Sequence, residues 1–415
     1  MASLPDLVDY AQVPAVVQRT LNHVDARLMD HGARVASIVG ALMDAHGGFT
    51  PQQKWDGCFL ALVHDIGAYK TEEIDLLVHF ETGNVWAHSI YGYLFLKYFS
   101  PLPRLSEAIL YHHTPWQYLS ELTDVDDDVK LLAQLINLGD RTDLYFGAKK
   151  HSAAEFRRYL KRTANIIYSP EVLALFLKAA PSLPPKPMPT LLPDEVILSN
   201  EAATDYLRML VFAIDFRSAF TVTHTVTTAA ISQELGKLMN LPKQELSELA
   251  FGALLHDLGK IGVPVEVLEN PGRLVGEDME LMRTHVVLTG DILGDAVSPA
   301  VRDIAVRHHE KLDGTGYPLG LTGDDLNLPQ RIIAVADIVS ALTSRRSYKT
   351  AYPKSRTVAI LTDMDKRGFV DHDVVAMMLR RFDSVMATVD ARCAPILQSY
   401  AAMHKEYDEL SLKFH

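Results

Sequence analysis

Histidine and aspartate recur through the second half of the chain in an order that suits a metal centre. The set comprises His224, His256, Asp257, His285, His308, His309 and Asp337. Nitrogen and oxygen donors in this proportion suit Fe, Mn, Zn, Co or Ni, and the imidazoles are too many for a site dedicated to Ca or Mg. A carboxylate adjacent to a ligand histidine, as Asp257 is, can bridge two ions that together activate a water. The set therefore predicts a centre for two metals.

These residues are expected on five helices or helix ends, because apolar residues recur at three- and four-residue steps and alternating β-branched runs are scarce. Leu281, Leu288 and Ile292 lie at helical spacing from His285, which predicts that this imidazole lies on the buried face of its helix. Burying an ionisable group costs on the order of several kcal/mol unless it is paired, hydrogen-bonded or metal-bound. One buried histidine is usually a satisfied core residue, so the argument for a metal depends on the whole set.

Two longer motifs contain four of these ligands. The first runs from His256 to Pro264 and reads HDLGKIGVP, and the second runs from His308 to Pro318 and reads HHEKLDGTGYP. With the flanking ligands they resemble the HD phosphohydrolase superfamily, specifically its HD-GYP branch, over roughly residues 219–352. The resemblance implies an all-helical domain that hydrolyses bacterial cyclic dinucleotides with two or three metal ions.

The resemblance also assigns roles by position. It places His224, His256, Asp257 and Asp337 on one ion, and Asp257, His285, His308 and His309 on the other, so that Asp257 bridges them. It implies that Lys260 neutralises a phosphoryl oxygen or assists the leaving oxygen. It further implies that substrate contacts come from Gly314, Gly316, Tyr317, Arg346 and Lys349. The glycines would let the loop turn tightly and approach a ligand, and a guanidinium can bind phosphate or stack on guanine.

Two departures from the resemblance bear on the number of ions. Phe220 occupies the position where some relatives have a glutamate that supports a third metal, and Ser340 occupies a position where they have a further carboxylate. The prediction is therefore two divalent ions in the second half, with Fe, Mn, Ni or Co all compatible with the donors.

The first half repeats the pattern. The corresponding residues are His31, His64, Asp65, His88, His112, His113 and Asp140. The successive steps are 33, 24, 24 and 28 residues, against 32, 29, 23 and 29 in the second half, which indicates an internal duplication. Ala68 replaces the lysine, and no glycine pair follows His113. A metal-loaded but inactive regulatory domain is the favoured interpretation, ahead of a second active hydrolase and a metal-free relic.

The domain boundaries follow from composition. Six prolines fall within residues 181–193, which forbids a regular helix and predicts an extended linker over 181–195. The sequence thus predicts two tandem all-α HD-type domains, a degenerate one over 1–180 and a catalytic one over 196–415. The first is expected to pack on or regulate the second.

Charge and composition restrict the partners. A formal charge of -12 argues against binding of long nucleic acid, which needs clustered Lys and Arg, although a small anionic ligand is compatible with it. No long apolar span or secretory signal is evident, so a membrane partner is not expected. With only two cysteines, a cytoplasmic location is expected.

The predicted function is a metal-dependent phosphodiesterase that opens 3′,3′-cyclic GMP-AMP or cyclic di-GMP to the linear 5′-phosphorylated dinucleotide. Two alternatives remain open: a cyclic dinucleotide receptor without turnover, and a general HD nucleotidase. The intact ligand set with Lys260 favours turnover, while the glycine loop with Arg346 and Lys349 favours a ring larger than a mononucleotide.

Overall fold

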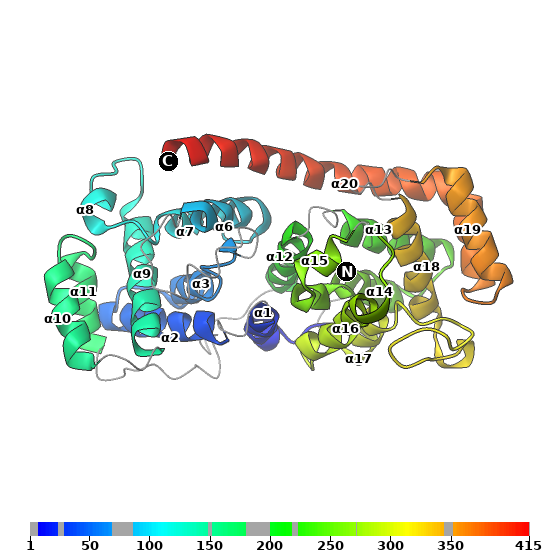
Figure 1. Cartoon of the computed structure of the whole chain (residues 1–415), viewed down its shortest axis with the longest axis horizontal. Helices are drawn as coiled ribbons and strands as arrows, with labels where there is room; N and C mark the ends of the chain where they lie inside the picture. Colours follow the sequence, from blue (N-terminus) through cyan, green and yellow to red (C-terminus); the bar gives the residue numbers. More distant parts are fainter. Residues whose placement is uncertain are drawn as a thin grey trace. The chain divides into compact units, whose positions relative to one another are not determined.

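The computed structural model describes residues 7–23, 29–68, 86–147, 152–179, 200–217, 223–270, 272–343 and 352–414. Within these ranges the chain forms helices, and β-structure is limited to isolated bridges, which confirms the all-α prediction (Figure 1). The predicted linker over 181–195 lies outside the described residues.

The chain divides into two units. The second-half unit comprises residues 1–16 and 200–401, and the first-half unit comprises residues 17–199 and 402–415. The division differs from the predicted ranges 1–180 and 196–415 at both ends of the chain. At the N-terminal end, the Asp9 N–H donates to the Ala296 carbonyl (2.8 Å) and the Ser298 N–H to the Leu7 carbonyl (2.9 Å). These backbone bonds hold residues 7–9 to the second-half unit.

The second-half unit has its core where α13, α14 and α18 pack with the first part of α20. Ile231, Leu249, Ile333 and Met378 are fully buried there. Apolar side chains at helical spacing on each of these helices account for the packing. The helices of this unit are α12 (Asn200–Arg217), α13 (His224–Leu238), α14 (Lys243–Leu255), η5 (Leu258–Gly262), α15 (Val265–Leu268), α16 (Gly276–Leu293), α17 (Pro299–Val306), η6 (Gly323–Asp325), α18 (Leu328–Thr343), α19 (Lys354–Lys366) and most of α20 (His372–Phe414), with η1 (Tyr10–Gln12) near the N-terminus.

The first-half unit is built around α2, α3 and α9. Local signals start several of its helices: Thr50 caps α3 before a proline at the first helical position, and Ser152 with Glu155 forms a capping box for α10. Its helices are α2 (His31–His46), α3 (Pro51–Leu62), α6 (Trp86–Phe99), η3 (Pro103–Leu105), α7 (Glu107–Tyr111), α8 (Trp116–Leu119), α9 (Asp127–Gly147), α10 (Ala153–Thr163) and α11 (Pro170–Ala179), together with the end of α1 (Val13–Asn22) and of α20.

One glycine in each unit sets the distance between two ligand segments. A Cβ added at Gly259 would lie 1.9 Å from the His285 carbonyl oxygen, and one at Gly67 would lie 2.0 Å from the His88 carbonyl oxygen. No larger residue fits, because the atom that it would meet is backbone. The segment after each His-Asp pair therefore lies directly against the helix that carries the third histidine.

The long helix α20 contributes to both units. It has 43 residues, of which those up to 401 belong to the second-half unit and the rest to the first-half unit. Within the first-half unit, Tyr407 stacks on Tyr91 of α6 with ring centroids 4.0 Å apart, and Lys97 contacts Glu406 at 2.5 Å. Across the described ranges, no helix combines the length and apolarity that crossing a membrane needs.

Candidate metal centre

The seven predicted ligands of the second-half unit converge from five helices. They occupy the first residue of α13, the segment directly after α14, the middle of α16, the segment after α17 and the middle of α18. All of these side chains are buried except that of His309, which is half-buried. The predicted placement on five helices or their ends is thus what the structure has.

One group of ligand atoms lies around His224 and His256. The Nε2 atom of His224 is 3.0 Å from Asp337 Oδ1 and 3.4 Å from Asp257 Oδ2. The Nε2 atom of His256 is 3.2 Å from the same Asp257 oxygen. Ligand atoms of His224, His256 and Asp257 all lie within 4.8 Å of one another, a spacing that one ion can span.

A second group is formed by His285, His308 and His309, whose ligand atoms also lie within 4.8 Å of one another. Asp257 faces this group with its other oxygen: Oδ1 is 3.5 Å from His285 Nε2 and 4.0 Å from His308 Nε2. The two oxygens of Asp257 therefore face two different sets of nitrogens. This is the arrangement that a bridging carboxylate needs.

Backbone carbonyls fix which nitrogen of each imidazole faces the centre. The Nδ1 atoms of His256, His285 and His308 contact the carbonyl oxygen three residues earlier at 2.7, 2.5 and 2.6 Å. In a neutral imidazole, an Nδ1–H that donates to a carbonyl leaves Nε2 with its lone pair, which is the form that binds a metal. Helix carbonyls thus orient three histidines so that Nε2 of each faces the candidate centre.

His224 is oriented by Ser340, which no motif indicated. Ser340 Oγ lies 2.9 Å from His224 Nδ1 and donates to the His224 carbonyl oxygen at 3.1 Å. Its acceptor lone pair is then available for the Nδ1–H, so that His224 also presents Nε2 to the centre. Sequence reasoning treated Ser340 only as a missing carboxylate.

Buried polar atoms without a partner show that the donors fit a metal. Among the described residues, His256 Nε2 and Asp257 Oδ1 have no hydrogen-bond partner. An unsatisfied buried polar atom costs about 1–3 kcal/mol, and native structures rarely keep one without a reason. The Nε2 atoms of His285 and His308 are 3.3 Å apart, and two lone pairs repel at that distance unless a proton or cation lies between them. Divalent ions that prefer nitrogen, one for each group of donors, would satisfy all of these atoms.

The charge states agree with this fit. Burial lowers the pKa of His285 to about 3 and of His309 to about 4, so both are neutral at pH 7. Burial also acts on His256, but the carboxylates of Asp257 and Asp337 outweigh it and raise its pKa to about 10. The neighbouring imidazoles hold the pKa values of both carboxyl groups well below their usual range. In the metal-free protein, a proton on His256 supplies the positive charge beside the two carboxylates that a metal ion would otherwise supply.

Lys260 lies in η5, one turn after the His-Asp pair. Its Nζ atom is 2.5 Å from Asp257 Oδ2, and the side chain is largely buried. The Lys260 amine therefore contacts the Asp257 carboxylate, which faces both groups of histidine nitrogens.

The loop after His308 and His309 is held in a specific shape. A Cβ at Gly316 would lie 2.4 Å from the Lys311 backbone nitrogen, and Gly314 has a φ of 78°. The Tyr317 ring lies 4.7 Å from the His309 ring, between centroids, and the Arg283 guanidinium lies 5.1 Å from the Tyr317 centroid. Sequence reasoning missed Arg283, because nothing in its local sequence links it to the loop.

Glu310 holds the far side of the same loop and was also missed. Its buried carboxylate accepts hydrogen bonds from the backbone N–H groups of Leu319 (2.7 Å) and Leu321 (3.0 Å). The position of Glu310 directly after the histidine pair is the signal that could have identified it. The predicted contacts Arg346 and Lys349 lie outside the described residues.

One packing expectation was wrong. His285 is buried, as predicted, but Leu281 is 43% exposed. The buried residues of α16 are His285, Val286, Thr289, Ile292 and Leu293. Residues 276–284 of α16 are all exposed or half-buried, so that apolar spacing one turn before His285 does not report burial.

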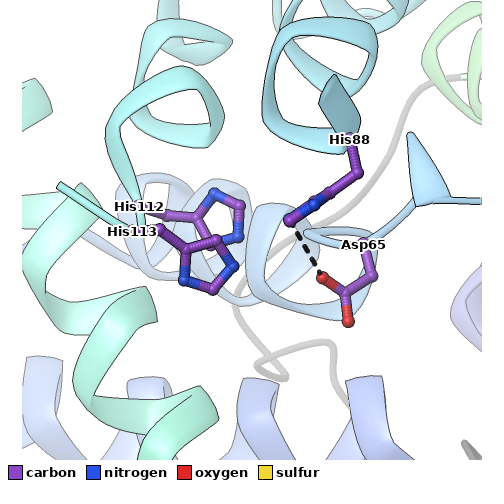
Figure 2. A group of neighbouring side chains, drawn as sticks. All are labelled: Asp65, His88, His112 and His113. Atoms are coloured by element: carbon purple, nitrogen blue, oxygen red, sulfur yellow. Dashed lines mark ion pairs between the residues drawn. The ribbon is translucent and has the colours of Figure 1, made fainter. Parts of the chain in front are cut away.

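The seven corresponding residues of the first-half unit also converge. They form two groups with ligand atoms within 4.8 Å: His31, His64 and Asp140 in one, and Asp65, His88, His112 and His113 in the other (Figure 2). Ala68, which replaces the lysine, is fully buried. After His113 the chain enters α8, and Trp116 and Gln117 donate backbone bonds to the Ile167 and Ile166 carbonyls.

Comparison with known proteins identifies the family. HD domain models match residues 208–374 and 28–144. The chain is 30% identical over 406 residues to 3′3′-cGAMP-specific phosphodiesterase 1 of Vibrio cholerae serotype O1, a match that covers 90% of this chain and 92% of the relative. The chain belongs to the HD-GYP family of cyclic dinucleotide phosphodiesterases.

Other HD-GYP relatives match less of the chain. A cyclic di-GMP phosphodiesterase of Thermotoga maritima is 36% identical over 152 residues, which is 36% of this chain and 41% of the relative. The crystal structure of a cyclic GMP-AMP-specific phosphodiesterase of Vibrio cholerae, V-cGAP3, superposes with a TM-score of 0.55 at 17% identity and covers 93% of this chain and 98% of its own. That structure shares the fold of both halves.

Proposed function

We propose that this HD-GYP phosphodiesterase hydrolyses 3′,3′-cyclic GMP-AMP in preference to cyclic di-GMP, giving the linear 5′-phosphorylated dinucleotide. One observation carries the preference: a relative that matches along both halves of the chain is 3′3′-cGAMP-specific. The cyclic di-GMP phosphodiesterase of Thermotoga maritima matches little more than a third of the chain.

We propose that two divalent ions bind the second-half unit. One would be held by His224, His256, Asp257 and Asp337, and the other by Asp257, His285, His308 and His309. Such ions lower the pKa of water and stabilise the negative charge that develops on the phosphoryl oxygens. The unpartnered atoms of His256 and Asp257 support this assignment.

The remaining roles are assigned to groups around the metal ligands. Lys260 would donate to a phosphoryl oxygen or to the leaving oxygen, since its amine lies beside Asp257. Tyr317 would stack on a base, because an aromatic ring can stack on the face of any purine. Gly314 and Gly316 would let the loop approach the substrate closely. We propose Arg346 and Lys349 as phosphate contacts.

A direct assay tests the preference. The full chain, loaded with Mn²⁺ or Fe²⁺, is given equal concentrations of the two rings, and the linear products are separated by chromatography. We expect linear product from 3′,3′-cyclic GMP-AMP to form faster. Faster cleavage of cyclic di-GMP would overturn the preference, and binding of both rings without cleavage would indicate a receptor. Cleavage of mononucleotides alone would indicate a general nucleotidase.

We propose that the first-half unit regulates the second and does not hydrolyse the ring itself. Ala68 stands at the position of Lys260, and α8 replaces the glycine loop. The helix α20 supplies a covalent route for coupling, because it belongs to both units. We expect Asp257→Ala to abolish hydrolysis and Asp65→Ala only to change its rate. Equal loss from both variants would show that the first half takes part in catalysis.

A further inference from the structure

The first-half unit contains a fuller set of converging ligands than the second. Asp65, His88, His112 and His113 bring four ligand atoms within 4.8 Å of one another, whereas every other such group in the described part of the chain has three members. Figure 2 shows the four side chains directed toward one space, from α6, from the end of α7 and from the segment after α3. Four protein donors complete the shell of a tetrahedral divalent ion.

Two imidazoles of the first-half unit, one from each group, are held by backbone carbonyls. The Nδ1 atoms of His64 and His112 contact the carbonyl oxygens of Ala61 and Ile109 at 2.8 and 2.6 Å. In the neutral rings the Nε2 atoms carry the lone pairs, and within the described residues these atoms have no hydrogen-bond partner. Both nitrogens of His113 and Asp65 Oδ1 likewise have no hydrogen-bond partner in the described part of the chain.

Asp65 faces two sets of nitrogens, as Asp257 does in the other unit. Its Oδ2 atom is 3.2 Å from His64 Nε2 and 3.7 Å from His31 Nε2, while its Oδ1 atom is 3.9 Å from His88 Nε2. His31 Nε2 also lies 3.4 Å from Asp140 Oδ1. The first-half unit therefore reproduces the arrangement around Asp257, with one carboxylate between two groups of donors.

In the first-half unit a carboxylate lies behind the first histidine, His31, whereas in the second-half unit the group behind His224 is an uncharged hydroxyl. His31 Nδ1 lies 2.7 Å from Asp143 Oδ2, and Arg34 holds the same carboxylate through Nε (2.6 Å) and Nη2 (3.0 Å). Asp143 is three residues after Asp140, as Ser340 is three residues after Asp337. A carboxylate behind a ligand imidazole fixes the ring and makes it a stronger donor than a hydroxyl does.

We propose that the first-half unit binds its own pair of divalent transition-metal ions, and that Asp143 is a positioning residue for this site. One ion would be held by His31, His64, Asp65 and Asp140, and the other by Asp65, His88, His112 and His113. Four buried imidazoles and the half-buried His113, all aimed at two carboxylates, have no use in apolar packing, and each unpartnered atom destabilises the fold unless an ion satisfies it. The site does not depend on hydrolysis by the second-half unit, so failure of either proposal leaves the other testable.

Metal counting tests the site. The full chain is stripped with a chelator, dialysed against Mn²⁺ and analysed by inductively coupled plasma mass spectrometry. We expect about four Mn²⁺ per wild-type chain, about two in Asp65→Asn and about two in Asp257→Asn, since each variant removes one bridging carboxylate. These substitutions preserve side-chain shape, and circular dichroism of the metal-free variants checks folding. An unchanged count in Asp65→Asn, or no Mn²⁺ left in Asp257→Asn, would overturn the proposal.

The role of Asp143 is tested in the Asp257→Asn variant, in which the remaining Mn²⁺ binding comes from the first-half unit. We expect Asp143→Asn to weaken Mn²⁺ binding by about 10- to 100-fold, because His31 loses its charged partner. Asp128→Asn, an exposed carboxylate on the same helix, is the matched control and should not change the affinity. A lower melting temperature of the metal-free protein with unchanged Mn²⁺ affinity would assign Asp143 a purely structural role. Partial recovery of affinity in Asp143→Glu would support the positioning role.

Discussion

At the scale of single residues, the hydroxyl or carboxylate behind the first histidine distinguishes the two units. His224 is supported by the neutral Ser340, while His31 is supported by Asp143 and Arg34. Outer partners of this kind tune ligand basicity without touching the ion. The two candidate sites, which have the same ligand types, therefore offer imidazole donors of different strength.

The support of His224 gives a first prediction. We expect Ser340→Ala to weaken Mn²⁺ binding in the second-half unit by about tenfold or more and to slow hydrolysis, because His224 loses the group that orients its ring. Metal analysis and a rate measurement at limiting Mn²⁺ check this. Ser247→Ala is the control, since that exposed hydroxyl donates to the Lys243 carbonyl within its own helix. Normal affinity and rate in Ser340→Ala would contradict the assignment.

The protonation of His256 gives a second prediction. Its pKa, raised to about 10, means that the metal-free protein carries a proton there at pH 7, and a metal must displace it. Mn²⁺ affinity should therefore rise with pH, by about tenfold per unit for each proton released, until the pH passes that pKa. Calorimetric titration in two buffers of different ionisation enthalpy measures the released protons. A Mn²⁺ affinity that does not change between pH 6 and pH 8 would contradict the displacement of a proton from His256.

At the scale of elements, one glycine determines how closely two ligand segments approach. Gly259 lies against the α16 backbone where that helix carries His285. The Gly259 N–H donates to the Thr289 hydroxyl (2.9 Å), which donates in turn to the His256 carbonyl oxygen (3.0 Å). A tight contact and a two-step hydrogen-bond chain thus tie the His-Asp pair to the helix of the third histidine.

This contact gives a third prediction. We expect Gly259→Ala to destabilise the protein by about 1–3 kcal/mol and to abolish most activity, since the added methyl group meets backbone and must displace α16. Gly290→Ala on α16 is the matched control, because its Cβ would meet the Val306 side chain at an ordinary 3.4 Å. That control should be neutral or slightly stabilising, as alanine favours helix. Denaturant unfolding and the rate of hydrolysis distinguish the two variants.

At the scale of the whole molecule, each end of the chain belongs to the unit that is formed mainly by the other half of the sequence. Residues 7–16 belong to the second-half unit, and residues 402–414 belong to the first-half unit. The end of α20 contacts α6, which carries His88, and Phe414 packs with Trp86 at 4.5 Å between ring centroids. The helix that begins in the core of one unit therefore ends on a ligand-bearing helix of the other.

This continuity gives a fourth prediction. We expect Tyr407→Ala to destabilise the first-half unit by about 1–3 kcal/mol, because α6 loses a stacked aromatic ring, and to change the rate of hydrolysis in the second-half unit. Hydrogen exchange of α6 peptides and the hydrolysis assay measure the two effects. Leu412→Ser is the control, since Leu412 is 84% exposed. A destabilised α6 with unchanged hydrolysis would argue against regulation through α20.

The sequence by itself determined the ligand types, their order and their helices. Helical periodicity and the duplicated spacing depend on neighbours in the chain, so both all-α halves and the two sets of seven residues could be predicted. Local spacing also misled once, at Leu281, because burial depends on what packs against a helix.

Only the tertiary structure decided which atoms meet across long separations. Ser340 reaches His224 across 116 positions, and Asp143 reaches His31 across 112. Arg283 at Tyr317 and the two exchanged termini are likewise contacts that no local pattern encodes. Hydrogen bonds and packing act through space rather than along the chain. Motifs can therefore name the ligands, while the groups that orient them are found only once the helices are assembled.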